Sequence, residues 1–324
     1  MEIDPEVYKP LKMDDAFHCQ PSPGFEWWYF DANFDNGYSF VTSWHIAGKA
    51  AEPEPEVPEP GFIAFAIYDP DGKRTATRVG FPVSAVSASR ETCDVKMGDN
   101  HIHGQIPRYE IHFRDGDLGG DLVYESLTQG YRNPPDGVAV LGQDPLRYMG
   151  HVVAQPRAKV TGKLTLAGKE IPINGEGYHD KNWGNVPLEN TLEQWYWGRI
   201  FIPGYTMVYA AVPGGGFLNL FKGEKLLVAS REMSAEPTDF ATDTVSGVKY
   251  PQKLPLKVDN PRVKGEIIHT LRKVVESPQE PMITTSPLRY FRFLSDCDIK
   301  LVADGEKIEV ATQVLHEFMA RKSS

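Results

Sequence analysis

The chain has 324 residues, a formal net charge of −10 and a pI of about 5.4. This length exceeds what one compact domain usually holds and predicts two, and the 41% hydrophobic and 24% charged residues are typical of a soluble globular protein. The acidic balance argues against nucleic-acid binding, which needs a basic surface, and against docking on anionic lipid.

Alternating apolar and polar residues, the pattern of half-buried strands, recur along the chain. They occupy residues 37–45, 62–68, 109–113, 158–166 and 205–212. Turn signals separate these runs at short intervals, among them Asp35-Asn36-Gly37, Asp115-Gly116 and Gly214-Gly215-Gly216. Many short strands at this spacing predict a mostly β protein of sandwiches or barrels.

Other segments lack this alternation. Weak helical patterns precede Trp195 and cover residues 313–319, although the latter fit a last strand equally well. Residues 51–60 (AEPEPEVPEP) predict a solvated extended loop, because proline removes backbone donors and the like charges repel. Residues 236–260 are expected to be rich in loops. A boundary after Trp183-Gly184 predicts domains of residues 1–187 and 188–324.

The three cysteines, Cys19, Cys93 and Cys297, are far apart and form no CxxC pair. The sequence therefore indicates neither a disulfide framework nor a thiolate zinc site, and at least one unpaired cysteine fits a reducing compartment. The N-terminus has no signal-peptide pattern, and no apolar stretch has the length of a membrane span. We expect a cytoplasmic protein with no stable membrane insertion, either a monomer or a weak homo-oligomer.

The aromatic residues are unevenly distributed. All six tryptophans lie in two regions, which hold Trp27, Trp28 and Trp44 and then Trp183, Trp195 and Trp197. Polar residues stand among them, namely Glu26, Asp31 and His45 in the first region and His179, Asp180, Asn182 and Arg199 in the second. Both regions are therefore candidates for a functional site.

Strand geometry sorts these residues into faces, because consecutive side chains point to opposite sides. Trp27 and Tyr29 are expected on one face, with Glu26, Trp28 and Phe30 on the other. Tyr178 and Asp180 are likewise expected to share a face opposite His179. Trp195 and Trp197 are expected opposite Tyr196.

A purely structural interpretation stays open at this point. Tryptophan is highly buried on average, so each of these rings could fill a barrel core. A carboxylate among aromatic rings is unfavourable unless it is paired or protonated. Asp180 could pair with Lys181, Arg199 or His179 in a structural ion-pair network.

Motifs for cofactors and metals are weak. His101-x-His103 could present two imidazoles on one strand face, but a third ligand at fitting spacing is missing. Gly214-Gly215-Gly216 lacks the setting and the lysine of a phosphate loop and is expected to be a hairpin turn. Ser39 and Ser43 are not in a nucleophile elbow, because Gly-x-Ser-x-Gly is absent. We expect no metal and no cofactor.

Two motifs carry a resemblance to a known family. Residues 26–31 (EWWYFD) followed by Asn36-Gly37, and residues 175–184 (GEGYHDKNWG), resemble motifs of the carotenoid 1,2-hydratases and related lipocalin-like proteins. Residues 156–162 (PRAKVTG) and 195–198 (WYWG) also fit that family. The resemblance covers about the first two-thirds of the chain. It is specific for the family and not for one reaction.

The resemblance implies two lipocalin-like β domains with a ligand pocket between them. The family includes hydratases that add water to an isoprenoid alkene, kievitone hydratase among them, and fungal Diels–Alderases that form decalin rings. The expected function is thus a cofactor-independent hydratase acting on an isoprenoid or another hydrophobic small molecule. A cofactor-free cyclase of a polyene and a non-catalytic carrier of hydrophobic ligands are the alternatives.

Alkene hydration itself constrains the site. The alkene must be protonated to a tertiary carbocation, which water then captures. A carboxylic acid kept neutral by burial supplies the proton, and electron-rich rings stabilise the cation. With the Gly-Tyr-x-Asp resemblance, this assigns Asp180 as the general acid, oriented with the water by Tyr178 and His179. The expected substrate-binding residues are Trp27, Trp28, Tyr29, His45, Asn182, Trp183, Trp195, Trp197 and Arg199.

Overall fold

The computed structural model describes residues 5–18, 20, 24–47, 61–133, 137–140, 144, 146–186, 192–278 and 288–321. Cys19 and the predicted loop at residues 51–60 lie outside the described residues. The chain divides into two compact units, Asp4–Thr191 and Leu192–Ser324. The boundary predicted between residues 187 and 188 also lies outside the described residues, so the division into residues 1–187 and 188–324 stays a prediction.

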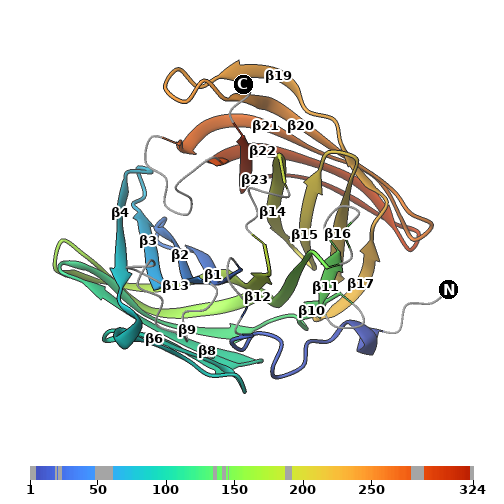
Figure 1. The fold of residues 1–324 in the computed structure, drawn as a ribbon. Helices are drawn as coiled ribbons and strands as arrows, with labels where there is room; N and C mark the ends of the chain where they lie inside the picture. The colour runs from blue at the N-terminus through green and yellow to red at the C-terminus, as the bar shows by residue number, and fades with distance from the viewer. Residues whose placement is uncertain are drawn as a thin grey trace. The chain divides into compact units, whose positions relative to one another are not determined.

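The described residues of the first unit form one 13-stranded sheet, blue to green in Figure 1. Its strands are β1 (Phe25–Phe34), β2 (Ser39–Ala47), β3 (Gly61–Tyr68), β4 (Arg74–Phe81), β5 (Val86–Ala88), β6 (Cys93–Met97), β7 (Asn100–Gln105), β8 (Arg108–Asp115), β9 (Leu118–Ser126), β10 (Tyr131–Arg132), β11 (Val138–Val140), β12 (Tyr148–Leu166) and β13 (Lys169–Gly184). Two short 3₁₀ helices, η1 (Pro5–Tyr8) and η2 (Val83–Ala85), accompany them.

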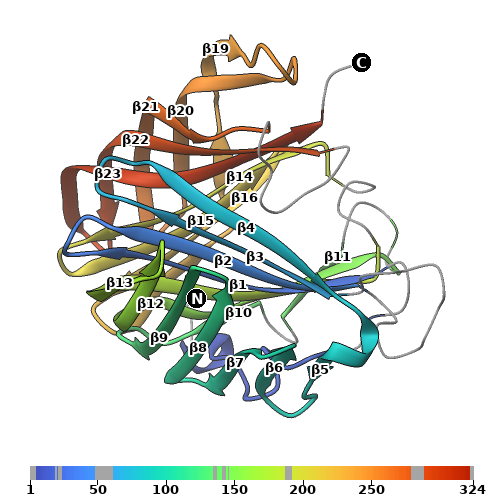
Figure 2. The same cartoon turned by 90° about the vertical axis from the view of Figure 1, so that its left-hand side faces the viewer.

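The strand order of this sheet is β4-β3-β2-β1-β13-β12-β9-β8-β7-β6-β5, with β10 and β11 also paired to β12. Figure 2 shows β2, β3 and β4 side by side. The ends of the sheet approach each other where Gly61 of β3 lies against Val86 of β5 and Met97 of β6. The sheet is therefore a nearly closed barrel.

The second unit contains a 10-stranded sheet among its described residues, yellow to red in Figure 1. Its strands are β14 (Gln194–Ile202), β15 (Tyr205–Val212), β16 (Gly215–Lys222), β17 (Lys225–Ser230), β18 (Met233–Ala235), β19 (Thr238–Thr242), β20 (Lys249–Asp259), β21 (Val263–Glu276), β22 (Leu288–Ala303) and β23 (Glu306–Arg321). The order is β17-β16-β15-β14-β23-β22-β21-β20-β18, with β19 on β20. A bridge between Gly216 and Glu232 brings its two ends together, which nearly closes this barrel too.

The strands follow from the alternation of the sequence. Along β22, buried and exposed side chains alternate over its second half, as expected for one face on a core. Gly37 closes the β1–β2 hairpin with a φ of 85°, a conformation that glycine adopts without a steric penalty. The mostly β fold and the hairpin at Gly214 are confirmed.

The structure decides two predictions at the level of elements. Residues 313–319 belong to strand β23, which pairs along its whole length with β22, so the strand alternative for this segment is confirmed. The expectation that residues 236–260 are rich in loops was wrong, because they contain β19 and β20, and the prolines and lysines of β20 obscured its alternation. None of the helices among the described residues is long and apolar enough to cross a membrane.

Each unit has its own hydrophobic core. The first includes Trp28, Trp44 and Trp183, and the second includes Tyr196 and Phe318. Trp183 packs flat over Gly150 of β12, where an added Cβ would lie 1.9 Å from Cε2 of the indole. Glycine at this position is thus required by close packing.

We expect Gly150→Ala to lower the free energy of unfolding by about 1–3 kcal/mol, the usual effect of overpacking a core. The matched control is Gly215→Ala, because a Cβ at Gly215 would meet no atom within 4 Å. Chemical denaturation of the two variants measures the difference. Equal stability of Gly150→Ala and wild type would show that the indole shifts aside freely.

Candidate functional site

Three neighbouring strands place the candidate site. In the antiparallel pairing of β1 with β13, Tyr29 lies opposite Asp180 and Trp27 opposite Asn182. On the other side of β13, His151 of β12 also lies opposite Asn182. Directly opposed residues share a face of the sheet, so these side chains meet on one side of the barrel wall.

Asp180 is the centre of this group. Its side chain accepts hydrogen bonds from Tyr178 Oη to Oδ2 at 2.8 Å and from Asn182 Nδ2 to Oδ1 at 2.8 Å. His151 Nε2 lies 3.3 Å from Oδ2. Asp180 is 5% exposed and Tyr178 is fully buried, whereas the His151 side chain is 21% exposed. We call these four residues the Asp180 cluster.

Aromatic rings continue the same face. Tyr29 and Tyr178 are in edge contact at 6.2 Å, and Trp27 lies 5.7 Å from His45 of β2, which stacks on Phe62 at 4.2 Å. The Oγ atom of Ser43 lies 2.6 Å from His45 Nε2.

The imidazole of His45 is uncharged at neutral pH. Burial and then the nearby Arg78 guanidinium lower the pKa of His45 to about 3, since both disfavour its charged form. The face beside the Asp180 cluster is thus aromatic, with a neutral imidazole among its rings.

The opposite face of the same strands is the barrel interior. His179 stacks on Phe30 at 3.8 Å, and Lys181 bonds Glu26 at 2.5 Å. Trp28 and Trp183 belong to the hydrophobic core there. Because neighbouring strand residues alternate in direction, His179, Trp28 and Trp183 lie away from the Asp180 cluster, and the structure does not bring these three predicted site residues to it.

Two of the three predicted ion-pair partners of Asp180 are engaged elsewhere. Lys181 pairs with Glu26, and His179 donates toward the backbone of Tyr29. Among the described residues, the ion pair recorded for Asp180 is with His151. Around His101 and His103, no group of three potential metal ligands occurs within the described part of the chain; His101 stacks on His112 and His103 is mostly exposed.

The second unit carries the remaining predicted residues. Trp195 and Trp197 are partly buried on the face of β14 opposite Tyr196, which enters the core, as the alternation predicts. Arg199 lies on the same face, its Cζ 4.4 Å from the centre of the Phe201 ring. That Trp195, Trp197 and Arg199 share a pocket with Asp180 stays a prediction.

A buried polar network adjoins this second face. Glu317 lies opposite both Trp197 and Arg292 in the strand pairing. Arg292 Nη2 donates to Glu317 Oε1 at 2.7 Å, and Tyr290 Oη donates to the same oxygen at 2.6 Å. Within this network, the buried charges of Arg292 and Glu317 compensate each other.

Sequence reasoning missed His151 and the Tyr290–Arg292–Glu317 network. His151 precedes the part of β12 whose alternation is clear, and only the register of β12 on β13 places it beside Asp180. Arg292 and Glu317 are 25 residues apart and meet through a long hairpin. Their signal in the sequence is a charged residue within an otherwise apolar strand pattern, which applies to both Arg292 and Glu317.

Two nearly closed antiparallel barrels, one carrying a buried carboxyl group among aromatic rings, define a lipocalin-like β protein. Residues 5–276 match the AttH-like family, and the chain belongs to this family.

Curated relatives agree with that assignment. The chain is 25% identical to the hydroxyneurosporene dehydrogenase of Chlorobaculum tepidum, over 95% of this chain and 85% of that protein. It is 28% identical to the quinolone epoxide rearrangement protein penF of Penicillium thymicola, over 59% of this chain and 57% of that protein. The second match thus spans little more than half of each chain.

Among solved structures, kievitone hydratase from Nectria haematococca superimposes with a TM-score of 0.63 at 15% identity, over 97% of this chain and 94% of that chain. This likeness establishes the shared fold. The resemblance to the hydratase-containing family seen in the sequence is confirmed.

Proposed function

We propose that this protein is a cofactor-independent hydratase that adds water to an alkene of an isoprenoid or another hydrophobic small molecule. The observation that carries the proposal is the Asp180 cluster: a buried carboxyl group, held at both oxygens, next to aromatic rings. Similarity to a hydroxyneurosporene dehydrogenase and to the fold of kievitone hydratase supports the choice of substrate class.

The reaction conserves its protons. The carboxyl group of Asp180 gives its proton to the less substituted alkene carbon, which leaves a tertiary cation on the neighbouring carbon. Water attacks that carbon, and the proton it sheds returns to Asp180. The product is a tertiary alcohol, and the acid is regenerated in each cycle.

The neighbours of Asp180 divide the remaining roles. Tyr178 and Asn182 fix the carboxyl plane through one hydrogen bond to each oxygen. His151, the most exposed of the four, holds the attacking water. The rings of Trp27 and Tyr29 stabilise the cation through their electron-rich faces.

A second function has one supporting observation. The similarity to a quinolone epoxide rearrangement protein, at 28% identity, favours acid-assisted rearrangement or cyclisation of a hydrophobic substrate. The same carboxyl group would protonate an oxygen or carbon of the substrate, and an internal nucleophile would replace water. The two functions differ in whether solvent oxygen enters the product.

Incubation in ¹⁸O-labelled water tests this difference. The probes are geraniol, farnesol and geranylgeraniol, acyclic isoprenoids with a trisubstituted terminal alkene. We expect a tertiary alcohol carrying one ¹⁸O atom, detected by mass spectrometry. A new product without the label would contradict hydration and favour rearrangement or cyclisation. Absence of any product together with tight probe binding would favour a carrier.

A further inference from the structure

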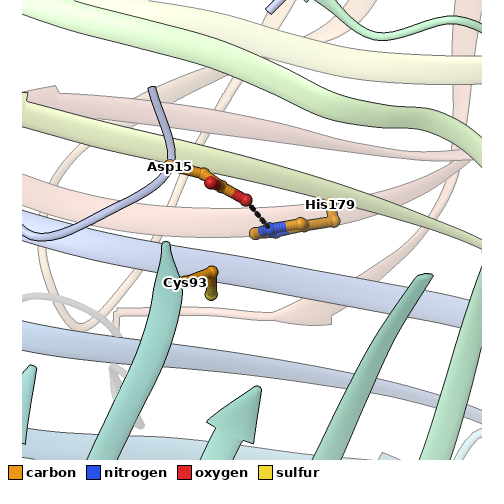
Figure 3. Close-up of side chains that lie close together, drawn as sticks. All are labelled: Asp15, Cys93 and His179. Atoms are coloured by element: carbon orange, nitrogen blue, oxygen red, sulfur yellow. Dashed lines mark ion pairs between the residues drawn. The ribbon is translucent and has the colours of Figure 1, made fainter. Parts of the chain in front are cut away.

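The barrel interior of the first unit contains a second cluster that the proposed hydration does not use. Asp15 precedes β1, Cys93 begins β6, and His179 lies on β13. All three are buried, and one potential ligand atom from each lies within 4.8 Å of the other two. Figure 3 shows Asp15 and His179 pointing toward each other, with Cys93 beside them. Within the described residues this is the one such group of three.

The hydrogen bond of His179 fixes where its free lone pair lies. Its Nδ1 is 3.0 Å from the carbonyl oxygen of Tyr29, which can only accept, so Nδ1 carries the proton. In the neutral ring Nε2 is then a bare acceptor. Nε2 has no hydrogen-bond partner among the described residues, and His179 is fully buried. A ring nitrogen oriented by a backbone carbonyl in this way is the usual arrangement of a metal-binding histidine.

The alternative of a histidinium bonded to Asp15 fits the geometry poorly. His179 Nε2 and Asp15 Oδ2 are 3.9 Å apart, beyond hydrogen-bond distance. Asp15 Oδ2 instead accepts from the hydroxyl of Tyr109, and the Asp15 backbone carbonyl accepts from Trp28 Nε1 at 2.7 Å. The carboxyl group is therefore held in place, with its second oxygen available.

Charge balance points in the same direction. The ammonium group of Lys181 is bonded to Glu26 and acts on Asp15 only as a more distant charge. A divalent cation bound by one thiolate, one carboxylate and one neutral imidazole forms a site of zero net charge. Such a site is far less costly to bury than an isolated carboxylate.

We propose that Asp15, Cys93 and His179 bind a structural Zn²⁺ ion inside the first barrel. Thiolate, imidazole and carboxylate together are the donor set that zinc accepts, at about 2.0–2.3 Å each. Ligand atoms around a tetrahedral zinc ion are then about 3.5 Å apart, so closing the site from the present separations needs only small side-chain movements. A water molecule or the second Asp15 oxygen completes the coordination, and the Cys93 proton is released on binding.

The ion would connect the segment before β1 to two strands on different sides of the barrel. Zinc binding would stabilise the folded first unit, because a metal bound only by the folded chain adds its binding free energy to the free energy of folding. The site and the Asp180 cluster lie on opposite faces of β13, so either proposal can fail without the other.

The test uses the full chain, stripped with a chelator and then titrated with Zn²⁺ or Co²⁺. The variants are Cys93→Ser and, as a matched control, Cys297→Ser, which replaces the buried free cysteine of the second unit. We expect wild type and Cys297→Ser to retain one zinc ion per chain after dialysis and to melt at higher temperature with zinc. Cys93→Ser is expected to bind zinc at least about tenfold more weakly.

Cobalt supplies a measurement that needs no variant. A thiolate ligand gives Co²⁺ a sulfur-to-metal charge-transfer absorption in the near ultraviolet, which we expect in wild type and in Cys297→Ser. The proposal is overturned if stripped wild type takes up no stoichiometric zinc, or if its cobalt form lacks this absorption. Equal zinc affinity in Cys93→Ser and wild type would overturn it as well.

Discussion

Replacing Asp180 by asparagine is expected to lower turnover of an isoprenoid alkene by about 10²–10⁴-fold, the usual contribution of a positioned general acid. Asparagine has nearly the same shape and can keep its contacts with Tyr178 and Asn182, but it has no carboxyl proton to give. Binding of the substrate should change little, because the apolar walls remain. The measurement is kcat and KM with the probe that the labelling experiment identifies.

Asp31→Asn is the matched control for this variant. Asp31 is a buried carboxyl on the same face and accepts a hydrogen bond from Tyr29. We expect it to keep most of the wild-type turnover. If Asp180→Asn retained full activity while its melting temperature stayed unchanged, Asp180 would not be the acid. A similar loss in both variants would indicate that the negative charge of the face matters, and not the proton.

A second large effect is expected from Glu26→Gln, which should lower the free energy of unfolding by about 3–5 kcal/mol. Glu26 and Lys181 are both essentially inaccessible, and their side chains meet at 2.5 Å. The Lys181 ammonium also lies 4.1 Å from the centre of the Trp28 ring. Removing the carboxylate leaves a cation in the core without its bonded counter-ion, a state that must either deprotonate or unfold.

The double variant Glu26→Gln with Lys181→Met separates pairing from packing. Because it removes both charges and keeps similar volumes, we expect it to recover most of the lost stability. Chemical denaturation of the single and double variants gives the coupling free energy. A double variant as unstable as Glu26→Gln alone would mean that lost packing, and not the unpaired charge, causes the effect.

Acid denaturation gives an independent check of this pair. Although burial raises it, the pKa of Glu26 is lowered to about 2 by the Lys181 ammonium and by hydrogen bonds from His18 and Lys181. A carboxyl whose pKa is lower in the folded state stabilises the fold above its ordinary pKa of 4.5, and this contribution is lost as the pH falls toward 2. Wild type should therefore lose stability across this interval more steeply than Glu26→Gln.

Local pattern predicted a substantial part of this molecule. Turn residues and alternation indicated a mostly β chain, and the period of two correctly placed Tyr178 and Asp180 on one face with His179 on the other. The same rule puts Trp183 and His179 on one face of their strand without saying that this face is the interior, so the resemblance placed them, with Trp28, in the expected pocket. Period gives the face and leaves open which face is the interior.

The remainder depends on register, which the sequence does not display. His151 joins Asp180 because β12 pairs with β13 at one particular offset, and a change of one residue would turn it away. Asp15 comes from an irregular segment with no period at all, so its approach to Cys93 and His179 leaves no local trace. Such contacts depend on how the strands pair around the whole barrel, and not on the local sequence.

Strand β13 thus carries two sets of side chains with different roles on its two faces. Tyr178, Asp180 and Asn182 form the side for which we propose catalysis, whereas His179, Lys181 and Trp183 hold the barrel together from within. Point substitutions on the side proposed for catalysis can change the chemistry while the scaffold survives, but an insertion or deletion in β13 would exchange the two sets at once. This separation offers a physical route by which members of one family could diverge in the reaction they perform while preserving the length and interior of this strand.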